Sequence, residues 1–133
     1  MLAKSTYFMF FVCFALWGLI ACSSKPKDNF QNLSADQFEE LILDENVQCV
    51  DVRTPAEYND GHIPNSTNIN VSDDSFAGMA DDLLEKERPV AVYCRSGKRS
   101  RKAANILQKK GFVVYNLDKG YMNWTELGKS TVQ

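Results

Sequence analysis

The stretch from Pro89 to Ser100 reads PVAVYCRSGKRS, and it decides the fold class of the chain. Its apolar run, residues 90–93, predicts a buried strand, and a helical pattern of alanine and aliphatic residues follows. A short loop of glycine, serine and basic residues joins the two. A strand that leads through a short loop into a helix is the repeating unit of parallel α/β sheets, in which ligands bind beyond the carboxyl ends of the strands.

Cys94 opens this loop, where a thiol can become reactive. Backbone N–H groups at a loop and at a helix N-terminus point at an anion. Together with cationic neighbours they lower the pKa of a thiol from about 8.5, which yields a thiolate nucleophile at neutral pH. The other loop residues are expected to surround the sulfur: Arg95, Ser96, Gly97, Lys98, Arg99 and Ser100. The alternative is a buried cysteine at a strand end, followed by a solvated basic turn.

The rest of the chain continues the alternation of strands and helices. Two capping boxes, Ser34 to Gln37 and Thr54 to Glu57, predict helix starts. A helix is expected over 76–87, with Leu83 and Leu84 facing inward. The other expected elements are strands over 47–52, 68–71 and 112–115, and helices over 100–110 and 121–127. This order predicts an α/β fold with a central parallel sheet that helices flank on both faces.

The N-terminal segment is typical of an export signal. Lys4 precedes an apolar run over residues 7–20, which is shorter than the roughly 20 residues of a membrane-spanning helix. Residues 19–22, Leu-Ile-Ala-Cys, resemble a bacterial lipobox, so Cys22 is expected to carry lipid after cleavage. An uncleaved membrane anchor and a cleaved soluble product are the alternatives.

These features divide the chain into three expected parts. They are a signal peptide over 1–21, a polar tether over 22–32 and one globular domain over 33–128. We expect an exported, lipid-anchored protein of the bacterial cell envelope, on the periplasmic or outer surface.

Cys49 and Cys94 are the thiols of the expected domain. Because export leads to an oxidising compartment, a disulfide between them is an open alternative. Cys49 lies within an apolar run, however, and core packing is its expected role. No Cys or His spacing indicates a metal or dithiol redox site, and we expect neither a metal nor another cofactor.

Charge is distributed unevenly along the chain. Loss of residues 1–21 removes only Lys4, which leaves 14 basic and 17 acidic residues and a net charge of −3. Residues 28–87 hold 15 acids and two bases, whereas residues 88–117 hold eight bases and no acid. The positive potential therefore centres on the cysteine loop and favours a small anionic substrate. The net acidic composition and the export signal argue against nucleic acid as a partner.

Several separated motifs resemble a single-domain rhodanese, over residues 30–127. They are VDVR at 50–53, EY at 57–58, GHIP at 61–64, CRSGKRS at 94–100, GF at 111–112 and the segment 117–124. The chain departs from the family at two turns, where Lys119-Gly120 replaces Gly-Gly and Asn65-Ser66 replaces Gly-Ala. Both departures lie outside the cysteine loop, so they bear on turn geometry and acceptor access.

The resemblance implies a rhodanese-like fold and a sulfurtransferase. Rhodaneses move a sulfane sulfur from a donor such as thiosulfate to cyanide or a thiol. Cys94 would attack the outer sulfur of the donor, release sulfite and hold the sulfur as a persulfide until an acceptor removes it. The expected partners are thus a small anionic donor, a thiol or cyanide acceptor and, through the lipid, a membrane; the oligomeric state is left open.

Other polar residues have supporting roles in this interpretation. Asp51 and Arg53 end a strand near the site and are expected to have a buried ion-pair role, with Glu57 among their candidate partners; a role in the chemistry is the alternative. His62 is expected to be structural, because a thiolate stabilised by backbone dipoles needs no base. Tyr121 and Trp124 are expected to pack in the core or at the rim.

Two other function classes remain to be distinguished. Cysteine-dependent phosphatases and arsenate reductases that share the fold have five residues between cysteine and arginine. Here Ser100 holds that position, and Arg99 comes after four residues, so the loop suits one sulfur atom better than a tetrahedral oxyanion. Some rhodanese-like modules are binding or sulfur-carrier domains without catalysis, and sulfur loading of Cys94 distinguishes them from enzymes.

Overall fold

The computed structural model describes residues 29–133. The predicted signal peptide, Cys22 and the greater part of the predicted tether lie outside these residues. No helix within 29–133 is both long enough and apolar enough to cross a membrane.

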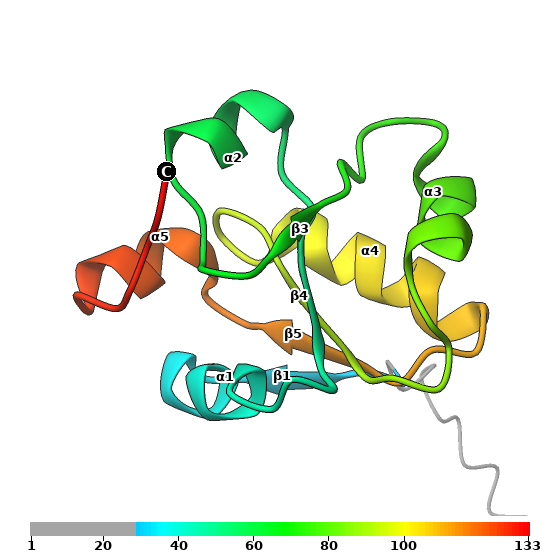
Figure 1. Ribbon diagram of the computed structural model, residues 1–133, viewed down its shortest axis with the longest axis horizontal. Coiled ribbons are helices and arrows are strands. Elements are labelled where there is room, and N and C mark those ends of the chain that lie inside the picture. The colour runs from blue at the N-terminus through cyan, green and yellow to red at the C-terminus, as the bar shows by residue number, and fades with distance from the viewer. Residues whose placement is uncertain (1–28) are drawn as a thin grey trace, which may run out of the picture.

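A five-stranded parallel sheet forms the centre of the domain (Figure 1). Its strands, in spatial order, are β1 (Gln31–Leu33), β5 (Val114–Leu117), β4 (Val90–Tyr93), β2 (Gln48–Asp51) and β3 (Thr67–Asn68). The helices are α1 (Ala35–Ile42), α2 (Pro55–Asp60), α3 (Phe76–Leu83), α4 (Lys98–Lys109) and α5 (Gly120–Glu126). The predicted α/β fold with a central parallel sheet is confirmed.

Helices cover both faces of this sheet (Figure 1). On one face, α3 and α4 bury Phe76, Ala104 and Leu107 in one core. On the other face, α1 and α5 bury Phe38 and Trp124, whose rings meet edge to face with centroids 6.2 Å apart. Because side chains alternate along a strand, successive residues of β2 and β4 enter opposite cores.

Both predicted capping boxes are present. The Ser34 hydroxyl accepts the backbone N–H of Gln37 at 3.3 Å, and the Gln37 side chain accepts the N–H of Ser34 at 3.0 Å. Thr54 and Glu57 make the same exchange at the start of α2, where Pro55 takes the first helical position. A proline there costs no hydrogen bond, since its missing N–H would be unpaired. These local signals start both helices where the sequence predicts.

The predicted helix over 76–87 ends earlier, at Leu83. The side chain of Gln48 accepts the N–H of Glu85 and donates to its carbonyl, both at 2.8 Å, so Glu85 bonds to a side chain outside the helix. The inward orientation predicted for Leu83 is wrong, because this residue is 54% exposed. Leu84, which is partly buried, packs against the core as predicted.

Further boundaries differ from the expectations, and β3 spans only Thr67–Asn68 where a strand over 68–71 is predicted. β1 includes Gln31 and Asn32, which the sequence places in the tether, because its backbone pairs with β5. β5 starts at Val114, two residues later than predicted, since Phe112 N–H is still bonded to the carbonyl of Leu107 at the end of α4. α4 itself starts at Lys98, two residues earlier than predicted.

Candidate functional site

Cys94 directly follows β4 and is completely buried. Its Sγ accepts the backbone N–H of Gly97 at 3.1 Å. Within residues 29–133, no other backbone N–H bonds to this sulfur. Of the loop residues that are expected to surround the sulfur, one thus donates a backbone N–H to the thiol. The role of the other loop residues around a persulfide stays a prediction.

Two glycines allow the cysteine loop to lie against the β5–α5 turn. Gly97 has φ +97°, and a Cβ there would lie 2.1 Å from the carbonyl oxygen of Asp118. Gly120 has φ +70°, and a Cβ there would lie 2.3 Å from the carbonyl oxygen of Arg95. This close approach lets Tyr121 N–H bond to the carbonyl of Cys94 at 2.7 Å. The first turn of α5 therefore fixes the backbone of Cys94.

The turns at Lys119-Gly120 and Asn65-Ser66, where the sequence departs from the family motif, keep residues that suit their backbone conformations. Gly120 retains the glycine that the close contact with Arg95 requires, so Lys119 replaces only the other glycine of the pair. Asn65 adopts φ +62°, a left-handed conformation that asparagine tolerates better than most residues.

Arg99 forms a two-point ion pair with Glu57 on α2. Its Nη1 and Nη2 donate to the two carboxylate oxygens, each at 2.8 Å. These hydrogen bonds lower the pKa of Glu57 from 4.5 to about 2, and the amide and hydroxyl of Thr54 contribute. The bonds to Glu57 also raise the pKa of Arg99, to which the negative charge of the Cys94 thiolate would add. Sequence reasoning missed this partner of Arg99.

The other loop side chains divide into exposed and buried ones. Arg95, Ser96 and Lys98 are exposed, and neither Arg95 nor Lys98 has an ion partner among the described residues. Ser100 is buried in the first turn of α4 and donates its hydroxyl to the carbonyl of Gly97 at 3.1 Å. Ser100 thus stabilises the loop from its buried side, whereas Arg95 and Lys98 form a cationic rim on its exposed side.

Asp51 and Arg53 have the predicted ion-pair role and pair with each other, whereas Glu57 pairs with Arg99. Arg53 Nη2 lies 2.6 Å from Asp51 Oδ2, and their side chains are 5% and 0% exposed. Burial lowers the pKa of Arg53, but the hydrogen bonds and charge of Asp51 more than offset this, so the pKa is raised. Arg53 also donates to the carbonyl of Gly61 at 2.7 Å and lies 4.2 Å from the centroid of the Tyr121 ring. The pair therefore ties the end of β2 to α5.

His62, Tyr121 and Trp124 pack as the sequence predicts. The His62 ring stacks on Tyr58, with centroids 3.7 Å apart, and its Nδ1 lies 2.9 Å from the carbonyl oxygen of Tyr58. Trp124 is buried and donates its indole N–H to the carbonyl of Ser130 at 2.9 Å.

A pocket of about 270 Å³ lies beside the cysteine loop, and we name it the loop-side pocket. Its lining residues come from the end of β2, from α2, from the loop and from α5: Arg53, Glu57, Asp60, Gly61, Arg95, Tyr121, Met122 and Thr125. Arg95, which follows Cys94 in the loop, lines this pocket, whereas Cys94 itself is not among the lining residues.

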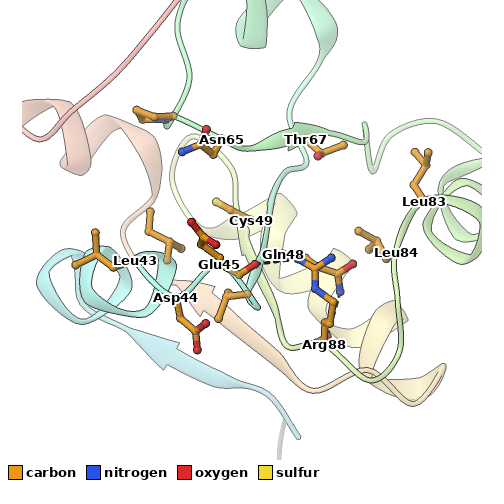
Figure 2. A pocket seen from close by; sticks show the side chains of 13 residues that line it. Leu43, Asp44, Glu45, Gln48, Cys49, Asn65, Thr67, Leu83, Leu84 and Arg88 are labelled. Carbon is orange, nitrogen blue, oxygen red and sulfur yellow. Dashed lines mark hydrogen bonds between the residues drawn. The ribbon is translucent and has the colours of Figure 1, made fainter.

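Cys49 lies away from this site, in the wall of a different pocket of about 530 Å³ (Figure 2). Burial raises the pKa of its thiol, and the charge of Asp51 adds to the effect. Cys49 belongs to the core under α1, whereas Cys94 belongs to the core under α4, so the two thiols occupy opposite faces of the sheet. Both are free, and the disulfide is not formed. Among residues 29–133, no group of three or more His, Cys, Asp or Glu could hold a metal.

Comparisons with known proteins agree with this architecture. Thiosulfate sulfurtransferase GlpE of Shewanella oneidensis is 37% identical over 100 residues, which are 74% of this chain and 95% of that protein. The tRNA uridine(34) hydroxylase of Pelagibacter ubique is 35% identical over 106 residues, but these cover only 35% of that enzyme. The similarity to the hydroxylase is therefore confined to one part of it.

A solved structure and a family profile also match the chain. The crystal structure of a rhodanese-related protein from Thermoplasma volcanium matches with a TM-score of 0.68 and 30% identity, over 77% of this chain and 98% of that one. The profile of the rhodanese-like domain matches residues 34–127. The chain belongs to the rhodanese-like domain family.

Proposed function

We propose that the protein is a sulfurtransferase that carries a sulfane sulfur on Cys94. The donor is a small anion such as thiosulfate, and the acceptor is cyanide or a thiol. The observation that carries the proposal is the thiol at the end of β4, which accepts the N–H of Gly97 beside a cationic rim. The similarity to a thiosulfate sulfurtransferase over almost its whole length supports the same chemistry.

The reaction has two steps, both at Cys94. In the first, the thiolate attacks the outer sulfur of thiosulfate, the S–S bond of the donor breaks, and sulfite leaves with the bonding electron pair. In the second, a thiolate or cyanide attacks the terminal persulfide sulfur, and Cys94 leaves as a thiolate. The N–H of Gly97 stabilises the negative sulfur before the first step and after the second.

The direct test is sulfur loading followed by unloading. Thiosulfate should add the mass of one sulfur atom to the intact protein, and cyanide should remove it as thiocyanate. Cys94→Ser should abolish both steps, whereas Cys49→Ser, a matched change of the other thiol in the domain, should preserve them. A wild-type protein that gains sulfur from no sulfane donor would contradict the proposal and favour a non-catalytic binding module.

We further propose that the protein works in the bacterial cell envelope, attached through lipid on Cys22. The support is the sequence alone: an apolar run that ends in Leu-Ile-Ala-Cys at residues 19–22. Cys22→Ala should release the chain from the membrane fraction, and unchanged membrane association would contradict the proposal.

A further inference from the structure

The loop-side pocket contains four charged side chains, of which two are already neutralised. Glu57 pairs with Arg99, and Arg53 pairs with Asp51. The other two charged residues, Arg95 and Asp60, are exposed and have no ion partner within residues 29–133. The pocket thus offers one free cation and one free anion to a ligand.

Arg53 adds hydrogen-bond donors to the cationic side. It is 96% buried, and its Nε and Nη2 are fully engaged with Asp51 and Gly61. Its Nη1 makes no hydrogen bond with any other residue of the described part of the chain, although Arg53 lines the pocket. A guanidinium nitrogen whose donors are not used within the protein favours a ligand that carries acceptor oxygens.

The wall between the charged groups is largely apolar. The Tyr121 ring covers the Arg53 guanidinium, and Met122, which is 46% exposed, lies beside it. The backbone N–H groups of Tyr121 and Met122 are bonded to the carbonyls of Cys94 and Arg95, at 2.7 and 3.0 Å. This wall is therefore attached to the nucleophile's own backbone.

The volume of the pocket suits a small molecule. At about 270 Å³, the pocket lies just below the range of about 300–1,000 Å³ that is usual for drug-sized ligands. A carboxylate, an ammonium and a short aliphatic body satisfy the free groups and the wall together. Thiosulfate, a dianion, would leave Asp60 uncompensated.

We propose that the loop-side pocket is the acceptor subsite, and that it selects a small zwitterionic thiol. The inference rests on the proposed sulfurtransferase function. Arg95 and Nη1 of Arg53 bind the carboxylate of the acceptor, and Asp60 binds its ammonium group. The acceptor thiolate attacks the terminal persulfide sulfur, the bond between that sulfur and Cys94 breaks, and the acceptor leaves as its own persulfide.

The test compares four acceptors on the sulfur-loaded protein. Cysteine carries both charges, cysteamine only the ammonium, 3-mercaptopropionate only the carboxylate, and 2-mercaptoethanol neither. For each acceptor, the variant's second-order rate constant is divided by the wild-type value, which cancels the acceptor's own nucleophilicity. Asp74→Asn, which removes an exposed acid outside the pocket, is the matched control and should leave all four ratios near one.

Each pocket variant should affect the acceptors according to charge. Asp60→Asn should lower the rate constants for cysteine and cysteamine about fivefold more than those for the other two acceptors. Fivefold corresponds to about 1 kcal/mol, which is the upper end of the usual strength of an exposed ion pair. Arg95→Gln should slow cysteine and 3-mercaptopropionate selectively. Asp60→Lys should reverse the preference and favour 3-mercaptopropionate over cysteamine.

Failure of the subsite and failure of the proposed function give different results. If thiosulfate loads Cys94 and cyanide unloads it, but both pocket variants change all four acceptors by one factor, the acceptor subsite is wrong and the sulfurtransferase stands. If the variants alter the KM of thiosulfate and not the acceptor rates, the pocket is a donor site and the inference is overturned. If no persulfide forms, the proposed function fails first.

Discussion

Arg99 and Glu57 meet in a two-point ion pair, with both N–O distances at 2.8 Å, although 42 positions separate them in the chain. The same carboxylate accepts the N–H of Thr54, at the start of α2. One side chain thus caps α2 and holds the first turn of α4, which carries the end of the cysteine loop.

The Glu57 ion pair makes stability dependent on pH. Because folding lowers the pKa of Glu57 from 4.5 to about 2, its contribution is fully present above pH 4.5 and is lost as the pH falls towards 2. The Glu57 side chain is 29% exposed, so after allowance for solvent screening we expect it to contribute about 1–3 kcal/mol to the free energy of unfolding. Urea unfolding of wild type and Glu57→Gln should differ by this amount at pH 7, and the difference should shrink below pH 4.5.

The comparison with the variant isolates this carboxylate. Asp73 and Asp81 also have lowered pKa values, from hydrogen bonds to Ser75 and Lys110, but they titrate in both proteins and cancel. A difference that stays constant between pH 7 and pH 3 would contradict the assignment.

Alanine substitutions at Gly97 and Gly111 distinguish the cost of backbone strain from the cost of a steric clash. Their φ values are nearly equal, +97° and +98°, yet a Cβ on Gly111 would meet nothing within 4 Å. Gly111→Ala should therefore cost only the left-handed strain, about 1–2 kcal/mol. Gly97→Ala should cost about 1–3 kcal/mol more, because Asp118 must move, and should also slow sulfur loading. Equal costs in chemical denaturation would show that the close approach to Asp118 is unimportant.

Local signals in the sequence were sufficient to predict much of the fold. The Ser34 and Thr54 capping boxes start their helices as predicted, because each cap is made within four consecutive residues. The run over 90–93 is β4, because both faces of that strand are buried. β1 escaped prediction, since only Leu33 of its three residues is buried and the strand exists through pairing with β5.

The position of Cys94 at a strand end was predictable, whereas the geometry around it was less so. The strand-end position of Cys94 and an ion-pair role for Asp51 and Arg53 could be predicted, because strand ends and charges are local features of the sequence. The partner of Arg99 and the contact between Gly120 and Arg95 arise only when distant loops meet. No local signal in the sequence indicated Asp60, because its place in the pocket depends on where α2 and α5 lie relative to each other.

Asp51 is expected to contribute to stability through Arg53. Asp51→Asn leaves a buried guanidinium without its counter-charge, which should cost about 3–5 kcal/mol in the free energy of unfolding. Asp74→Asn, at an exposed acid, is the control and should change it by less than about 0.5 kcal/mol. Similar values for the two variants in urea denaturation would contradict a structural role for the pair.

Cys49 should be inert in the folded protein. Burial raises the pKa of its thiol, so almost no thiolate is available at neutral pH. Iodoacetamide at pH 7.5 should leave the Cys49 peptide unmodified in the native protein and modify it completely in urea, as peptide mapping can measure. Rapid native modification of Cys49, or a peptide that links it to Cys94, would contradict the buried free thiol.

Lys98 should attract the donor without taking part in the chemical step. It is exposed at the start of α4, and a charge there raises the local concentration of an anion near Cys94. Lys98→Gln should raise the KM of thiosulfate about twofold at 0.1 M salt, leave kcat unchanged, and lose this effect near 0.5 M salt, where the screening length falls to about 4 Å. Lys109→Gln removes the same charge eleven residues along the helix, about 16 Å away, beyond the screening length of about 10 Å at 0.1 M salt. Steady-state kinetics that give equal KM changes for both variants would mean that net charge, and not the rim of the loop, attracts the donor.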